Sequence, residues 1–175
     1  MLREIDEETR LVAFLAALCL FMSTIEYAIP KPVPFFRIGL ANAPMLLAVR
    51  KLSPGKMLLL AALKALGQGL ISGTFLSYVF LFSLAGTFSS CLTMIAVAAI
   101  GGSRVTRIGI SVSSGLVSNI AQLVLARYIL FGSGIGYLTP LILGIGTASS
   151  VFLGYVSELF IRESRWYALL PEFRR

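Results

Sequence analysis

The sequence predicts an all-α integral membrane protein, a bundle of six transmembrane helices whose second helix is short or irregular. Of the 175 residues, 57% are hydrophobic and only 13% are charged, whereas about a quarter of the residues in a soluble domain are charged. The mean hydropathy is +0.89. Apolar runs of membrane-spanning length follow one another with short connections. We therefore divide the chain into a tail (1–10), one membrane domain (11–161) and a second, basic tail (162–175).

The first two predicted spans differ in character. Residues 11–29 are long enough to cross a bilayer and carry one acid, Glu26, near their end. Three prolines on alternate positions in residues 30–37 exclude a regular helix there. Residues 38–49 would rise only ~18 Å as a helix, which is less than the thickness of the bilayer core. This second segment must either recruit the residues before it or stay partly re-entrant within the protein.

The other four predicted spans alternate with polar or glycine-rich turns. The turns are very tight at residues 73–74, basic at 101–107 and uncharged at 132–136. The spans themselves cover residues 57–75, 75–100, 108–131 and 137–161.

The basic residues predict the orientation in the membrane. With six crossings, both tails and two of the loops share one side, and the opposite side carries only Lys31 and Arg37. Cytoplasmic loops are enriched in lysine and arginine, so we expect both termini in the cytoplasm. The eleven residues of the basic side are Arg3, Arg10, Arg50, Lys51, Lys56, Arg104, Arg107, Arg162, Arg165, Arg174 and Arg175.

The composition excludes several kinds of chemistry. The chain has no histidine and one aspartate, Asp6, so histidine catalysis and an Asp-rich Mg²⁺–diphosphate site are excluded. Cys19 and Cys91 stand alone in apolar runs and form no metal or redox motif. There is no Walker loop, so any ATP must be hydrolysed by another chain. We predict no enzyme activity, metal ligand or cofactor in this chain. The cations are too scattered to indicate nucleic-acid binding.

Polar residues inside apolar spans mark positions that face protein, water or a ligand, because they are unfavourable in lipid. Lys64 and Gln68 are four residues apart and share one face of the third span. On the fifth span Ser111, Ser118 and Gln122 form a stripe at helical spacing, with Asn119 beside it. Two interpretations stay open for both sets, namely contact with a ligand or partner, and hydrogen bonding within the protein.

Three further charges fall toward the non-cytoplasmic end. Glu26 either pairs with Arg37 or Arg127, or contributes to a ligand site. One acid and two arginines leave these three residues with a net positive charge, which favours a ligand with a carboxylate or phosphate. Separately, the spacings Ala13-x-x-x-Ala17 and Gly69-x-x-x-Gly73 are typical of close contacts between helices.

Three segments resemble a known membrane family, heptaprenyl diphosphate synthase component I, also called Gx transporter. The resemblance covers residues 11–160. Members often carry a histidine before the asparagine of the fifth span, where this chain has Ser118, so no role that needs an imidazole carries over. The segments are Ile29-Pro30-Lys31-Pro32-Val33-Pro34 with Arg37-Ile38-Gly39-Leu40-Ala41-Asn42; Ser83-Leu84-Ala85-Gly86 with Ser90 and Met94; and Gly109-Ile110-Ser111 leading to Asn119-x-x-Gln122.

The resemblance implies a bacterial cytoplasmic membrane protein, because the family is similar in layout to the substrate-binding S components of energy-coupling factor transporters. It implies that residues 30–37 form a lid and that Ala13 and Ala17 dock on a coupling subunit. The synthase activity in the name is not implied, because one aspartate in a tail cannot build a diphosphate–Mg²⁺ site.

Two functions follow as expectations. The first is a transport subunit that binds a small anionic or amphipathic molecule, vitamin-like or flavin-like, and is powered by a partner ATPase complex. The alternative is a non-transporting subunit of a flavin-based electron-transfer or quinone- or polyprenyl-related assembly, with redox proteins as partners. The candidate substrate-binding residues are Glu26, Arg37, Asn42, Lys64, Gln68, Ser111, Asn119, Gln122 and Arg127.

Overall fold

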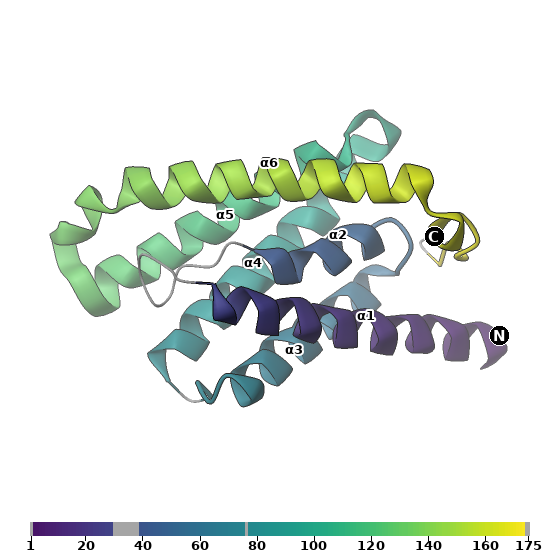
Figure 1. Ribbon diagram of the computed structural model, residues 1–175, viewed down its shortest axis with the longest axis horizontal. Coiled ribbons are helices and arrows are strands. Elements are labelled where there is room, and N and C mark those ends of the chain that lie inside the picture. The colour runs from purple at the N-terminus through teal and green to yellow at the C-terminus, as the bar shows by residue number, and fades with distance from the viewer. Residues whose placement is uncertain (1, 30–38, 76, 174–175) are drawn as a thin grey trace.

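A computed structural model describes residues 2–29, 39–75 and 77–173, and every regular element in these ranges is helical (Figure 1). The predicted lid and Arg37 lie outside the described residues. A 3₁₀ turn, Leu40–Asn42, leads into α2, and a π-helical turn, Arg127–Phe131, extends α5. The α-helices of the described ranges are α1 (Leu2–Ala28), α2 (Ala43–Ala48), α3 (Pro54–Ile71), α4 (Tyr78–Gly101), α5 (Arg107–Ala126), α6 (Thr139–Glu163) and α7 (Arg165–Ala168).

Four helices in the described part of the chain are long and apolar enough to cross a membrane. They are the spans Glu7–Ala28, Tyr78–Gly101, Arg107–Phe131 and Thr139–Glu163, so the chain is an all-α, multi-pass membrane protein. The expected second and third spans do not meet the same requirement. The helix α2 has only six residues, and α3 carries Lys56, Lys64 and Gln68 in eighteen residues. The described ranges also hold seven α-helices where six were expected, since α7 forms in the predicted C-terminal tail.

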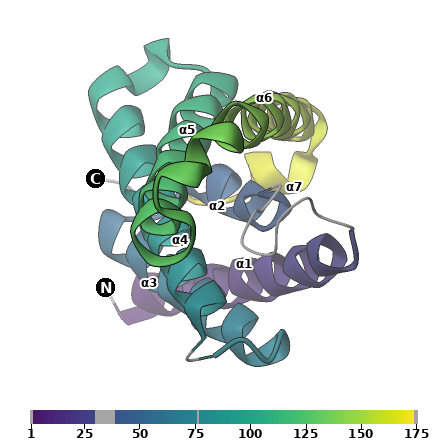
Figure 2. The same cartoon turned by 90° about the vertical axis from the view of Figure 1, so that its left-hand side faces the viewer.

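The long helices pack one on the next in the order α1, α3, α4, α5 and α6, and α2 lies among them. The helix α5 packs against both α4 and α6, while α1 packs against α3, and α3 against α4. Figure 2, a view turned by 90°, shows α2 between α1 and α6. This short helix contacts α1, α3, α5 and α6. An element too short to span the bundle therefore lies at its centre.

The two ends of the bundle differ in character. The starts of α1 and α7 lie at the same end in Figure 1. The helix α1 begins at Leu2, so most of the predicted N-terminal tail continues the first helix. The opposite end carries exposed tyrosines, and such side chains are enriched where membrane proteins meet the bilayer surface. These tyrosines are Tyr27, Tyr78, Tyr128 and Tyr137.

The C-terminal segment is bonded to the end of α2. The guanidinium of Arg107, at the start of α5, donates to the carbonyl of Leu46 (2.9 Å) and to the hydroxyl of Tyr167 in α7 (2.9 Å). That hydroxyl in turn donates to the carbonyl of Leu47 (3.1 Å). A cation near the last carbonyls of a helix is favourable. The C-terminal end of α2 is thus fixed by residues from two distant parts of the chain.

Candidate functional site

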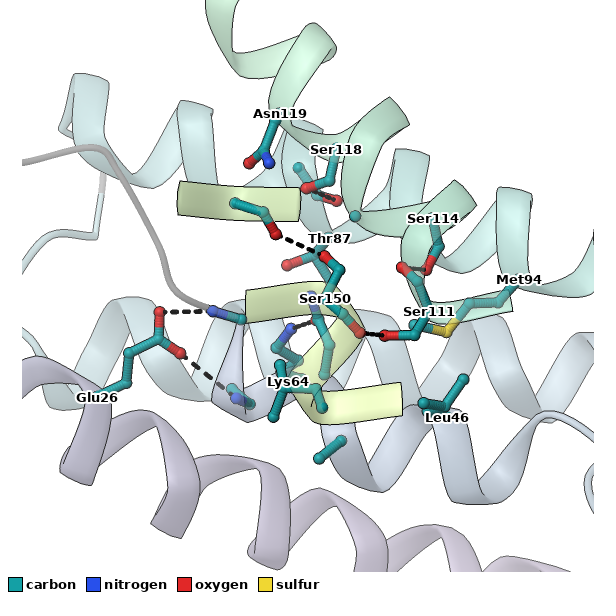
Figure 3. A pocket seen from close by; sticks show the side chains of 18 of the residues that line it. Glu26, Leu46, Lys64, Thr87, Met94, Ser111, Ser114, Ser118, Asn119 and Ser150 are labelled. Atoms are coloured by element: carbon teal, nitrogen blue, oxygen red, sulfur yellow. Dashed lines mark hydrogen bonds between the residues drawn. The ribbon is translucent and has the colours of Figure 1, made fainter. Parts of the chain in front are cut away.

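A small polar cavity lies inside the bundle, between α1, α2 and the helices α3 to α6 (Figure 3). The space open to the centres of water-sized spheres is about 40 Å³. Seven of the nine residues predicted to bind a substrate line it, although they come from separate parts of the sequence. These seven are Glu26, Asn42, Lys64, Gln68, Ser111, Asn119 and Gln122.

The two remaining candidates do not contribute to the described cavity. Arg37 falls among the residues that the structure does not describe. Arg127 lies in the π-helical turn after α5, where its side chain is exposed and does not line the cavity. It follows Gln122 by five residues, which places it about 140° around an ideal helix from the polar stripe. The cavity therefore lacks one of the two arginines that were expected to give the ligand site a positive charge.

Lys64 and Gln68, the pair predicted on the third span, both lie on the buried face of α3, as their spacing of four residues indicates. Lys64 is 4% exposed and Gln68 is 8% exposed. The ammonium of Lys64 donates to the side-chain oxygen of Asn42, the residue immediately before α2. A cation in the membrane interior needs such a partner. This bond joins α3 to the start of α2, so Lys64 both lines the cavity and holds its wall.

Glu26 fixes the other side of the same wall. Its carboxylate accepts hydrogen bonds from the backbone N–H groups of Gly39 (3.1 Å) and Ala41 (3.4 Å). A carboxylate is favourable at the beginning of a helix, where N–H groups lack partners. Gly39 has a φ of +94°, a backbone conformation that residues with a Cβ atom rarely adopt. Among the described contacts the partners of Glu26 are backbone groups and Arg127 is not one of them, while the pairing with Arg37 lies outside the described residues.

The polar stripe of α5 makes the hydrogen bonds within the protein that were one of its two interpretations, and it also faces the cavity. Ser111 donates to the carbonyl of Ser150 in α6 (2.7 Å), and Ser118 donates to the carbonyl of Gly86 in α4 (2.9 Å). The side-chain amide of Gln122 donates to the Ser118 hydroxyl (3.3 Å). Such bonds are the usual way in which small polar residues hold membrane helices together.

Glycines make room for the larger side chains of the stripe. A Cβ atom at Gly146 would overlap the side-chain amide of Asn119, and one at Gly86 would overlap that of Gln122. A Cβ atom at Gly115 would likewise overlap the hydroxyl of Ser150. The cavity therefore depends on small residues as much as on polar ones.

Several lining residues were not among the sequence candidates. Ser83 and Thr87 come from α4, and Ser114 and Ser150 from α5 and α6. A signal for some of them was present in the sequence. Ser83 and Thr87 are four residues apart on one helix face, and Gly146-x-x-x-Ser150 on α6 is a pair of small residues at the spacing of a close helix contact.

The cavity can bind polar groups by hydrogen bonding, and the described part of its lining carries no net formal charge. Its charged residues among the described positions are one acid, Glu26, and one base, Lys64. The described residues contain no group of three or more His, Cys, Asp or Glu side chains that could hold a metal ion. Hydroxyls and carboxamides dominate the lining, and both can donate and accept hydrogen bonds.

A second, apolar groove lies at the end of the bundle that holds the termini. It is open to water-sized spheres over about 440 Å³, between α1 and the C-terminal segment. Phe14 and Trp166 meet in it, with ring centroids 5.5 Å apart. Ala13 and Ala17, the predicted docking residues, are exposed on α1. The lining residues of the groove are Glu7, Arg10, Leu11, Phe14, Trp166, Leu170, Pro171 and Phe173.

Comparison with known proteins gives one match. The family model described as heptaprenyl diphosphate synthase component I matches residues 15–160. No curated protein and no solved structure matches the chain. The matched range includes every described residue that lines the cavity.

Proposed function

The chain belongs to the heptaprenyl diphosphate synthase component I family, and we propose that it is a membrane transport subunit that binds a small molecule in its polar cavity. In this role it resembles the substrate-binding S components of energy-coupling factor transporters. It takes its ligand from the outer side of a bacterial cytoplasmic membrane and releases it inside when a partner ATPase complex reorients it. We assign no catalytic step to this chain.

One observation carries the proposal, namely that polar side chains from α1 and the helices α3 to α6 converge on a single cavity inside an apolar bundle. Each such residue is costly in a membrane unless it faces protein, water or a ligand. Hydrogen bonds between helices satisfy part of the set, such as Ser111 and Ser118. Gln68 and Ser83 have buried oxygen atoms with no partner among the described residues. This surplus supports a binding role.

The size of the cavity defines what must move. A space of 40 Å³ holds roughly three water molecules, whereas sites for vitamin-sized ligands have volumes of about 300–1,000 Å³. A vitamin-like or flavin-like ligand therefore requires α1, the 3₁₀ turn and α2 to separate from α4 to α6. The bonds that Glu26 and Lys64 make to residues 39–42 are the ones that such opening strains. The balanced charge favours an amphipathic ligand over a strongly anionic one.

The proposal also includes the topology and the partners. Both termini lie in the cytoplasm, and α2 and α3 belong to two further crossings beside the four long spans. Ala13 and Ala17 on the exposed face of α1 dock on the coupling subunit. The absence of a nucleotide-binding motif from the sequence requires that the ATPase be a separate chain.

Isolation of the protein from its own membranes, with identification of its partners and of any bound small molecule, tests this proposal. Recovery of ATPase subunits supports it. Uptake of the identified molecule by cells should fall at least tenfold with Asn119→Ala, since sites that hydrogen-bond a ligand lose about this much when a bond is removed. Ser113→Ala is the control on the same helix, since its hydroxyl bonds only the carbonyls of its own helix. Equal uptake by both variants would count against the proposal.

A second candidate is a non-transporting subunit of a quinone- or polyprenyl-related, or flavin-based electron-transfer, assembly. The family description, which names a component of a synthase, favours it. The apolar groove beside Phe14 and Trp166 adds support, since it suits a lipophilic chain. Co-purification of redox proteins or a prenyl synthase in place of ATPases, with shortened or depleted quinone side chains after deletion, would select this function.

A further inference from the structure

The hydrogen-bonding capacity of the cavity is divided unequally between its walls. On the α5–α6 wall the hydroxyls of Ser111, Ser118 and Ser150 each donate to a backbone carbonyl, the last to Gly146 at 2.8 Å. These groups serve contacts within the bundle. These hydroxyls can still accept a hydrogen bond, but their protons are already donated, so a donor to the ligand's acceptor must come from another group.

The α3–α4 wall has capacity to spare. The side-chain oxygen of Gln68 and the hydroxyl of Ser83 have no hydrogen-bond partner among the described residues. Both side chains are more than nine-tenths buried, at 8% and 3% exposed, and both line the cavity. Buried polar groups in native proteins are almost always bonded. The occupant of the cavity is therefore the partner that these two groups lack.

The chemistry of the two side chains limits the occupant. The carboxamide oxygen of Gln68 accepts and the hydroxyl of Ser83 can donate, so together they complement a group that offers both a donor and an acceptor. The only charged lining residues in the described ranges, Glu26 and Lys64, have opposite signs. A net anion meets the carboxylate and a net cation meets the ammonium, whereas a neutral group avoids both penalties.

From these contacts we infer that the cavity binds the neutral amide-type edge of its ligand, a carboxamide, lactam or similar group, through Gln68 and Ser83. The inference rests on the proposed binding function and names the chemical class that the site selects. It replaces the carboxylate or phosphate expected from the charges of the sequence.

Three probes with the same branched skeleton of four heavy atoms separate the possibilities. Acetamide is the neutral amide, acetate the anion without donors, and isopropylammonium the cation without acceptors. The measurement is the thermal unfolding of the full chain in detergent against probe concentration, at constant ionic strength. Acetamide should raise the unfolding temperature in a saturable way, because a ligand that binds the folded state stabilises it. The other two should need at least about tenfold higher concentrations.

Matched variants locate the effect. Ser83→Ala should raise the half-maximal acetamide concentration about tenfold. Ser90→Ala is the control, because Ser90 lies on the same helix and is also buried without a partner among the described residues, but does not line the cavity. It should bind acetamide as the wild type does. If Ser83→Ala does not fold, Gln68→Met, which keeps the length of the side chain, is the second variant. It should weaken the binding of acetamide to the same extent.

The inference is overturned if acetate or isopropylammonium stabilises as well as acetamide, if Ser90→Ala and Ser83→Ala behave alike, or if no probe stabilises the protein because water alone fills the cavity. Native mass spectrometry then distinguishes this failure from that of the proposed function. A bound small molecule together with a negative acetamide result removes the inference alone. The absence of any bound molecule removes the binding function itself.

Discussion

At the scale of single residues, three glycines determine how closely the polar side chains of the cavity approach one another. Gly86, Gly115 and Gly146 each stand where a Cβ atom would overlap an amide or hydroxyl from a neighbouring helix. Packed interiors do not absorb an added methyl group without a shift of side chains or backbone. The identity of these small residues is therefore part of the site.

Gly146→Ala should destabilise the protein by about 1–3 kcal/mol, because the new methyl group displaces Asn119. Gly144→Ala is the matched control on α6, where a Cβ atom meets nothing within 4 Å. That change should be neutral or stabilising by up to about 1 kcal/mol. Thermal unfolding in detergent measures both. Equal stability of the two variants would show that Asn119 does not depend on the space at Gly146.

Tyr167 makes the stability of the C-terminal contact dependent on pH. Burial raises the pKa of Tyr167 above its ordinary value, and the nearby Arg107 opposes this shift only in part. The folded protein then holds the phenol proton more tightly than the unfolded chain. Its contribution is complete below the unfolded pKa of about 10 and is lost as the pH rises through the folded value. Tyr167→Phe should therefore show a smaller loss of unfolding temperature than the wild type between about pH 9 and pH 11. An unchanged pH profile would contradict the assignment.

The sequence predicts single residues of the site where their polarity is unusual for their surroundings. Lys64, Gln68 and Asn119 stand out in apolar spans, and all three line the cavity. Ser83 belongs to a segment of the family resemblance but is not among the binding candidates, because a serine in a membrane helix commonly bonds its own backbone. Arg127 is a candidate by charge, yet its position along α5 turns it away from the stripe.

At the scale of elements, α2 depends on bonds from outside itself. Six residues are too few for a helix to be stable alone. Glu26 and Lys64 hold the residues before its start, and Arg107 holds the carbonyl of Leu46 at its end. The sequence predicts a short or irregular second element from its length and prolines. It does not predict these partners, because they lie far away along the chain.

Glu26→Gln should weaken the start of α2. The amide keeps one oxygen, which is now neutral, and carries an NH2 group in place of the other. This group cannot accept, so the bond from Gly39 or Ala41 is lost, at a cost of about 1–3 kcal/mol. Hydrogen exchange of the backbone amides in residues 39–48 should become faster. Glu163→Gln, at the exposed end of α6, is the control and should leave exchange in this segment unchanged. Identical exchange in the two variants would mean that Glu26 does not hold this turn.

At the scale of the whole molecule, composition and the lengths of apolar runs suffice to predict the membrane class and the helical fold. They predict six crossings, whereas four helices in the described ranges meet the requirement for a span. The difference arises because α3 carries the polar residues of the cavity and α2 is buried by its neighbours. Both helices are apolar enough to be buried inside a bundle. The length and hydropathy criteria, however, detect only helices that can lie in contact with lipid.

The proposed topology predicts opposite labelling at the two ends of α6. Tyr137 is 91% exposed before this helix and Leu169 is 84% exposed after it. The native cysteines Cys19 and Cys91 are buried and should react little. In intact cells a membrane-impermeant maleimide should label Tyr137→Cys, and it should label Leu169→Cys only after the membrane is opened. Labelling of both variants from outside would exclude a single crossing by α6.

The most direct measurement on the central claim is native mass spectrometry of the protein released from its own membranes, for the wild type and for Lys64→Met. If the polar hollow is a binding site, the wild type carries a small molecule of defined mass, and the variant carries less of it or none. A wild type free of any such molecule, or a variant that retains it fully, would contradict the claim and leave Lys64, Asn119 and Gln122 with a purely architectural role.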